Sequence, residues 1–320
     1  MSLFNMTSSG AARGALFLAL IALAGCRSEV PSGKRPAVVI AMIDTLRADY
    51  VGAYGFAGPI SPAIDRIAAE GVVFESCSAP APWTKPSIAS LFSGLEPEVH
   101  QVLTEQGKYR ERGKAGESER FNVLADDIDT LAEAFQSAGY RTAAFVANPW
   151  IRPELGFAQG FDEFHGDENA AQAEPGTKFP GGVVLDQLRD FLVRRPQEKP
   201  VLLYLHFMEV HGPYDAPEED YRAIVSSDSL GPPQPLLPVR FKLMPPYLRT
   251  ASWVDEAEAK DVRTWRARYA AGVRVVDRHI ATLRQQLEQA GIWDDAIVVV
   301  TSDHGEQLYD HQGWDHGYSL

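Results

Sequence analysis

Cysteine and basic residues are both scarce in this chain of 320 residues. Its two cysteines, Cys26 and Cys77, exclude a framework of disulfides, and Cys77 is expected to be a small buried apolar residue. Lysine and arginine number 30 against 43 acidic residues, so the formal net charge is −13. No basic stripe is visible, which excludes nucleic acid as a partner. An anionic substrate would need cations supplied locally, and metal ions are their natural source.

Long hydrophobic runs are also absent, since the apolar run at residues 15–24 is too short to span a bilayer. It follows Arg13 and ends in Leu-Ala-Gly-Cys, which resembles the site at which bacterial lipoproteins are cut and acylated. The sequence predicts a signal peptide at residues 1–25, lipidation at Cys26 and a tether at residues 26–36. The mature chain would be held at a membrane of the bacterial cell envelope, facing the periplasm or the exterior. A plain secretory signal with an incidental cysteine is the alternative.

Four continuous apolar runs predict buried parallel strands, and each run is followed by polar residues. They lie at residues 37–43, 142–146, 201–208 and 296–301. Three segments between them carry helix signals, and the second of these has a capping box of Thr130 and Glu133. The segments run from Ser61 to Gly71, from Thr130 to Gly139 and from Tyr269 to Leu287. The alternation predicts one α/β domain over residues 37–320, with a mostly parallel sheet covered on both faces.

Asp44 and the pair Asp303 and His304 follow two of the predicted strands directly. Ligand sites in open α/β sheets gather at the carboxyl ends of the strands, so these side chains are candidate metal ligands. Two carboxylates and one imidazole suit Mn²⁺ or Zn²⁺ better than Ca²⁺ or Mg²⁺. Asp44 could instead be a helix cap.

Thr84 begins the stretch Thr-Lys-Pro-Ser, which has the pattern of a helix start. Its hydroxyl could be the fourth metal ligand, and metal coordination would then activate it as a nucleophile. The free N–H groups of the same helix start favour an anionic group. The alternative is that Thr84 is an N-cap and nothing more.

Several blocks of this sequence resemble, in the same order, the sulfatase family of the alkaline phosphatase superfamily. The resemblance covers about residues 37–320. The blocks are residues 43–49 with 52–55, residues 82–94, residues 130–133 with 139–142, residues 208–214, residues 269–277 and residues 301–306.

The resemblance implies an alkaline-phosphatase-like, doubly wound fold and a divalent metal. Reaction would take place at a sulfate or phosphate ester through a covalent enzyme intermediate. By matching position, Asp44, Asp303 and His304 are metal ligands and Thr84 is the nucleophile. His211 and His316 would bind the ester or protonate its leaving group. Lys85 is a further candidate substrate ligand.

Two departures from the family pattern affect the expected activity. Members that use formylglycine have Cys or Ser at the position of Thr84 and Arg at the position of Ile88, so no formylglycine is expected. Threonine resembles the phosphoryl-transferring relatives, including lipoteichoic acid synthases and phosphoethanolamine transferases. The sequence also ends at Leu320, where relatives continue, so a C-terminal subdomain is expected to be missing.

The sequence therefore favours a lipid-anchored, metal-dependent hydrolase of sulfuric or phosphoric esters that reacts through a covalent Thr84 intermediate. A transferase of phosphoryl headgroups in the same superfamily is one alternative. A non-catalytic envelope lipoprotein that binds an anionic glycan or lipid headgroup is the other. The oligomeric state and the number of metal ions stay open.

Overall fold

The structure is a computed structural model of the chain, and it describes residues 35–103, 122–166, 180–236 and 260–317. The chain divides into a leading unit, residues 1–35, and a second unit, residues 36–320. The predicted signal peptide and Cys26 lie outside the described residues. Within the described residues, no helix combines the length and apolar character that crossing a membrane requires.

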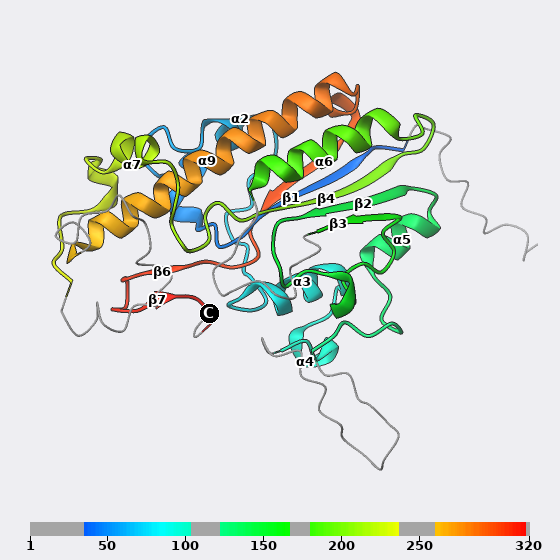
Figure 1. Cartoon of the computed structure of the whole chain (residues 1–320), viewed down its shortest axis with the longest axis horizontal. Coiled ribbons are helices and arrows are strands. Elements are labelled where there is room, and N and C mark those ends of the chain that lie inside the picture. Colours follow the sequence, from blue (N-terminus) through cyan, green and yellow to red (C-terminus); the bar gives the residue numbers. More distant parts are fainter. Residues whose placement is uncertain (1–34, 104–121, 167–179, 237–259, 318–320) are drawn as a thin grey trace, which may run out of the picture. The chain divides into compact units, whose positions relative to one another are not determined.

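The second unit is built on a parallel sheet of five strands in the order β3-β2-β4-β1-β5 (Figure 1). The strands are β1 Val38–Ile43, β2 Arg141–Val146, β3 Glu163–His165, β4 Val201–Phe207 and β5 Ile297–Thr301. A small antiparallel pair follows, β6 Gln307–Leu308 with β7 Trp314–Asp315. The four strands predicted from apolar runs are confirmed. β3 was not predicted, because it is three residues long and only partly buried.

Helices cover both faces of the sheet, as the alternating sequence pattern predicts (Figure 1). One face carries α2 Pro62–Glu70, α6 Gly181–Arg194 and α9 Val262–Gln289, with α7 Glu218–Ile224 against α9. The other carries α3 Thr84–Ser93, α4 Pro97–His100 and α5 Leu131–Ser137. Short 3-10 turns lie at η1 Ala48–Tyr50, η2 Gly52–Tyr54, η3 Pro153–Leu155, η5 Asp228–Leu230 and η8 Trp293–Asp295.

Residues of β1 alternate between two apolar clusters, one on each face of the sheet. Val39, Ala41 and Ile43 belong to the cluster under α2, α6 and α9. Ile40 and Met42 belong to the cluster under α3 and α5. β1 is therefore buried on both sides, which explains its unbroken apolar sequence.

β5 departs from the expectation of strands covered on both faces. It lies at the edge of the sheet, where Ile297 is 54% exposed and Val299 is 40% exposed.

The expectation for Cys77 is wrong, because this residue is exposed in an irregular segment between α2 and α3. An isolated small residue carries no periodicity, so the sequence pattern gives no measure of its burial.

The three predicted helices are confirmed, but α9 begins at Val262, seven residues before the predicted start at Tyr269. α2 begins at Pro62 and is followed by Gly71, and α5 is preceded by a complete capping box of Thr130 and Glu133. The N-terminus of α2 is capped from a distance by Asp277 of α9, which accepts hydrogen bonds from Ala63 N and Ile64 N, both at 2.9 Å.

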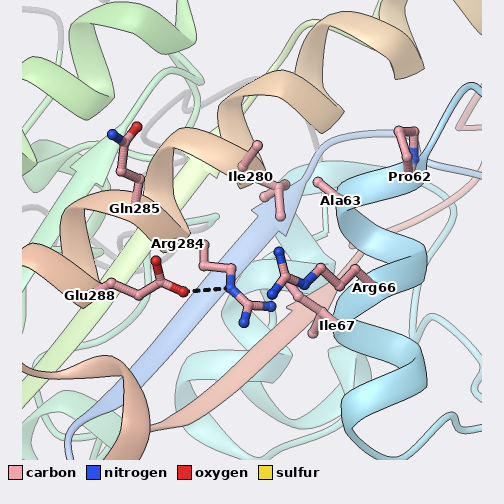
Figure 2. A pocket seen from close by; sticks show the side chains of 9 residues that line it. Pro62, Ala63, Arg66, Ile67, Ile280, Arg284, Gln285 and Glu288 are labelled. Carbon is pink, nitrogen blue, oxygen red and sulfur yellow. Dashed lines mark hydrogen bonds and ion pairs between the residues drawn. The ribbon is translucent and has the colours of Figure 1, made fainter.

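A surface groove of about 350 Å³ lies between α2 and α9 (Figure 2). Its two arginines, Arg66 and Arg284, are both engaged by carboxylates. Glu70 pairs with both of them, and Glu288 pairs with Arg284 at 2.7 Å. The groove therefore offers no unneutralised charge that would mark it as a functional site.

Replacing Asp277 tests the contact between α2 and α9. Among the described residues, Asp277 is the only side chain of α9 that accepts hydrogen bonds from backbone N–H groups of α2. Asp277→Ala therefore removes the acceptor of Ala63 N and Ile64 N. We expect the free energy of unfolding, measured by chemical denaturation, to fall by about 1–3 kcal/mol. Asp277→Asn keeps an acceptor oxygen and should lose less. The control Asp190→Ala, on the exposed side of α6, should stay within about 0.5 kcal/mol of the parent. An equally small change in Asp277→Ala would contradict the capping role.

Candidate active site and metal centre

Polar side chains from four strand ends meet at the carboxyl edge of the sheet. Asp44 follows β1, Asn148 lies two residues after β2, and Asp303 and His304 follow β5. His206 lies within β4, and its partners in the neighbouring strands are Met42 and Val146. All five polar side chains are buried. Parallel strands bring their carboxyl ends to one edge, so residues up to 260 positions apart in the sequence become neighbours.

The two oxygens of Asp44 have different surroundings. Oδ2 accepts hydrogen bonds from Asn148 Nδ2 at 2.6 Å, from His206 Nε2 at 3.1 Å and, more weakly, from Thr84 Oγ1 at 3.4 Å. Oδ1 is buried and has no hydrogen-bond partner. Buried carboxylate oxygens normally accept hydrogen bonds, so an oxygen left without a donor indicates a missing ligand.

The two oxygens of Asp303 also have different surroundings. Its Oδ1 accepts from Thr45 N at 3.2 Å and from His304 N at 3.0 Å, while Oδ2 is buried without a partner. Thr45 has a φ of 59°, a left-handed conformation that is uncommon for threonine. This conformation accompanies the hydrogen bond from Thr45 N to Asp303, and the Thr45 carbonyl accepts from Tyr269 OH at 2.7 Å.

The oxygens without donors lie around Nε2 of His304. Asp44 Oδ1 is 3.5 Å from that nitrogen, and Asp303 Oδ2 is 3.4 Å from it. Thr84 Oγ1 is 3.3 Å from the same nitrogen. Ligand atoms bound tetrahedrally to one metal at 2.0–2.2 Å are separated by about 3.3–3.6 Å. The three oxygens are therefore at the distance from His304 Nε2 that ligands of one divalent cation would have.

His304 is oriented for metal binding. Its Nδ1 is 2.9 Å from the Gly305 carbonyl, which can only accept, so Nδ1 carries the proton and Nε2 keeps its lone pair. A second possible grouping replaces His304 by His206 in a triad with Asp44 and Asp303. We favour His304, because His206 Nε2 already lies within hydrogen-bonding distance of Asp44 Oδ2.

The electrostatics of the two carboxylates also favour a cation. Burial works against the ionised form of Asp44, but the hydrogen bond from His206 and the nearby imidazoles hold its pKa well below the usual range. Burial and the charge of Asp44 raise the pKa of Asp303 to about 7. Two buried carboxylates this close cannot both be ionised at low cost without a positive charge between them.

Thr84 is the first residue of α3 and projects into this site. The N-cap is Trp83, whose side chain makes no capping hydrogen bond, so the interpretation of Thr84 as a simple N-cap is wrong. The hydroxyl of Thr84 instead lies near Asp44, His304 and Asn148. Trp83 gives the start of α3 no side-chain cap, and a helix start of this kind favours an anion.

His211 and His316 are brought together beside His304. The ring centroids of His316 and His304 are 4.5 Å apart, and those of His316 and His211 are 5.0 Å apart. His316 Nδ1 is 3.0 Å from Asp315 and 3.4 Å from Glu306. Burial acts against the charged imidazole, but these two carboxylates outweigh it and raise the pKa of His316 to about 11. Burial lowers the pKa of His211 and of His304.

Lys85 and Ile88 are both completely buried. Burial and the nearby Arg152 lower the pKa of Lys85 to about 8, and its role as a substrate ligand stays a prediction. Ile88 packs in the apolar cluster between α3 and the sheet, so this position contributes to the core and not to the binding of an anion.

Sequence reasoning missed His206, Asn148, Glu306 and Asp315. His206 could have been noticed as the one basic residue in the apolar run of β4, where a buried imidazole needs a polar partner. Asn148 follows a predicted strand by two residues, as a strand-end ligand would. The pairing of Glu306 and Asp315 with His316 depends on the β6–β7 hairpin, which the sequence pattern does not reveal.

A cavity of about 760 Å³ adjoins Asp303 and His304 from the side of β5 and α3. Its lining among the described residues includes Phe74 and Leu91 but not Thr84, His211 or His316. This cavity therefore does not reach the hydroxyl of Thr84 or the imidazoles of His211 and His316.

The fold and the site define a class of protein: α/β proteins with an alkaline-phosphatase-like fold and a buried site for a divalent cation. Among solved structures, phosphonate monoester hydrolase of Agrobacterium radiobacter is similar, with a TM-score of 0.66 and 21% identity over 89% of this chain and 66% of that one. The C-terminal periplasmic domain of EcEptC from Escherichia coli, in complex with Zn, has a TM-score of 0.60 and 16% identity over 89% and 69%. These likenesses confirm the predicted fold.

The chain belongs to the sulfatase family, whose model, described as Sulfatase, matches residues 36–319. An arylsulfatase of Clostridium perfringens is 22% identical over 87% of this chain. A multifunctional alkaline phosphatase superfamily protein of Trinickia caryophylli, PehA, is 24% identical over 87%. The chain spans 64% of the length of each of these two relatives.

Metal analysis tests the site directly. We expect the purified protein to bind one divalent ion tightly at this position, and Asp303→Asn to lower the affinity roughly 100-fold or more, because Oδ2 is then no longer an anionic ligand. Equilibrium dialysis with elemental analysis gives both values. The control Asp310→Asn changes a nearby carboxylate that pairs with Arg47, and should bind metal like the parent. Equal affinity in Asp303→Asn would contradict the assignment.

Proposed function

We propose that this chain is a metal-dependent hydrolase of sulfuric or phosphoric esters in which Thr84 is the nucleophile. The observation that carries the proposal is the position of Thr84 Oγ1, 3.3 Å from His304 Nε2 at the uncapped start of α3. The names of the relatives support ester hydrolysis in general terms, because they include an arylsulfatase and a phosphonate monoester hydrolase.

The residues of this site supply three parts of such a reaction. Asp44, Asp303, His304 and Thr84 would hold the cation. When bound, a divalent cation lowers the pKa of a coordinated hydroxyl and neutralises charge on an anionic ester. The N–H groups at the start of α3 would bind a non-bridging oxygen of the ester, where the negative end of the substrate complements the helix dipole.

The proton of Thr84 Oγ1 would pass to solvent when the hydroxyl is coordinated, and the covalent step then forms a bond from Oγ1 to sulfur or phosphorus and breaks the bond from that atom to the ester oxygen. The departing oxygen takes up a proton, and we assign this proton to His316, which Asp315 and Glu306 hold protonated beside His304. Water then attacks the Thr84 ester and releases sulfate or phosphate. His211, which burial keeps neutral, is placed to accept the proton of that water.

Formylglycine has no part in this proposal. Thr84 cannot be converted to an aldehyde, and the buried Ile88 leaves position 88 without a guanidinium. The covalent ester of Thr84 is stable enough that an activated water must hydrolyse it. Neutral His211 would activate this water.

The lipid anchor at Cys26 and the place in the bacterial cell envelope belong to the same proposal. They rest on the sequence of residues 1–26 alone. An envelope location would expose the site to sulfated or phosphorylated glycans and lipid headgroups, and the anchored chain would act at a membrane surface.

Three substitutions at Thr84 test the nucleophile. With metal loaded, we expect Thr84→Val, which keeps the shape and removes the hydroxyl, to lower kcat/KM at least about 10³-fold. Thr84→Ala should behave in the same way, whereas Thr84→Ser should keep measurable activity. The substrates are p-nitrophenyl sulfate, phosphate, phosphodiester and phosphonate. Metal content is determined in the same samples, so that loss of metal is not mistaken for loss of the nucleophile. Full activity in Thr84→Val would contradict the proposal.

A further inference from the structure

Besides the weak hydrogen bond from Thr84, Asp44 Oδ2 accepts hydrogen bonds from two residues with no place in the reaction described above. His206 Nε2 donates at 3.1 Å and Asn148 Nδ2 donates at 2.6 Å. These two donors occupy one side of the carboxylate and leave Oδ1 free of any partner. Two buried polar side chains directed at one oxygen carry a desolvation cost that a purely structural site would avoid.

The orientation of Asn148 is fixed by the backbone. Its Oδ1 accepts a hydrogen bond from Trp150 N at 2.7 Å, so the NH₂ group must be the end that faces Asp44 and Thr84. The side chain is 3% exposed, and bulk water does not replace these contacts.

His206 is placed by the register of the sheet. It pairs with Met42 of β1 and Val146 of β2, and Asp44 and Asn148 lie two residues beyond those partners. Side chains two residues apart in a strand share a face, so the three polar residues emerge together under α3. Tyr204, two residues earlier in β4, has its hydroxyl 2.9 Å from His206 Nδ1 and fixes the imidazole from behind.

We propose that His206 and Asn148 are positioning residues that hold Oδ2 of Asp44, so that Asp44 binds the cation through Oδ1 alone. A carboxylate with both oxygens free can bind a metal through both. In this site the second oxygen would compete for the coordination position of Thr84 Oγ1. The two donors thereby keep that position for the nucleophile. The inference rests on the proposed metal site and deepens it.

The competing arrangement makes His206 a metal ligand with Asp44 and Asp303. It would break the hydrogen bond between His206 Nε2 and Asp44 Oδ2, and it would not use His304 Nε2, which faces both unpartnered oxygens. The two arrangements predict different effects of a glutamine at position 206. Glutamine keeps an N–H donor near the place of Nε2, but it is a poor ligand for Zn²⁺ or Mn²⁺.

Metal affinity of the full chain, measured without substrate, tests the proposal. Competition with a chromogenic chelator gives the Kd for Zn²⁺ and Mn²⁺. We expect His206→Leu and Asn148→Leu each to weaken binding about 10–100-fold, as loss of an outer hydrogen bond to a ligand does. His206→Gln should stay within about threefold of the parent. The control Thr142→Val makes a similar polar-to-apolar change at a buried position of β2 and should leave the Kd unchanged.

The visible spectrum of the Co²⁺-loaded protein gives a second readout that a merely structural role would not move. If Asp44 becomes bidentate in His206→Leu, the coordination number rises and the absorption band weakens, while His206→Gln keeps the parent spectrum. Parent-like affinity in both leucine variants overturns the proposal. A loss in His206→Gln as large as in His206→Leu also overturns it, in favour of His206 as a ligand.

Two further variants keep the test decisive. If His206→Leu does not fold, Asn148→Leu and Tyr204→Phe replace it. Tyr204→Phe removes only the hydroxyl behind His206 and should weaken metal binding by a few-fold. Unchanged affinity in both overturns the proposal. Failure of the proposed function would appear differently, as normal metal binding and normal effects of these variants in a protein that hydrolyses no ester.

Discussion

Two carboxylates buried side by side, Asp44 and Asp303, are the constraint on which the rest of the site depends. Each has one oxygen bound to protein donors and one oxygen without any partner. The two unpartnered oxygens and Thr84 Oγ1 lie 3.3–3.5 Å from His304 Nε2, as ligands of a single cation would. A positive charge at this place removes the repulsion between the carboxylates and links four segments of the chain.

The fold produces this arrangement through parallel strands. The carboxyl ends of β1, β2, β4 and β5 lie along one edge, and the start of α3 adds Thr84 to it. Because the register pairs Met42 and Val146 with His206, the residues just beyond these strands are delivered to one face. Position in the sheet thus decides which atoms of Asp44 are available to a metal and which are held by the protein.

Much of this could be predicted from the sequence, and the remainder could not for physical reasons. Apolar runs with polar ends identified β1, β2, β4 and β5, and with them Asp44, Asp303 and His304. Burial on both faces explains the signal in β1, β2 and β4, whereas β5 keeps an apolar sequence although it is partly exposed. The edge position of β5 depends on strand order, which no local pattern contains. Asn148 and His206 depend on register between distant segments. The N-cap of α3 is Trp83 and not Thr84. A sequence pattern cannot locate a helix start to within one residue, so it could not decide between them.

The most direct test of the account is a crystal structure of the metal-loaded protein with anomalous scattering data that locate the ion. The account predicts one ion bound by Asp44 Oδ1, Asp303 Oδ2, His304 Nε2 and Thr84 Oγ1, with His206 and Asn148 still donating to Asp44 Oδ2. An ion bound by His206 Nε2, or by both oxygens of Asp44 with Thr84 outside the coordination sphere, would contradict it.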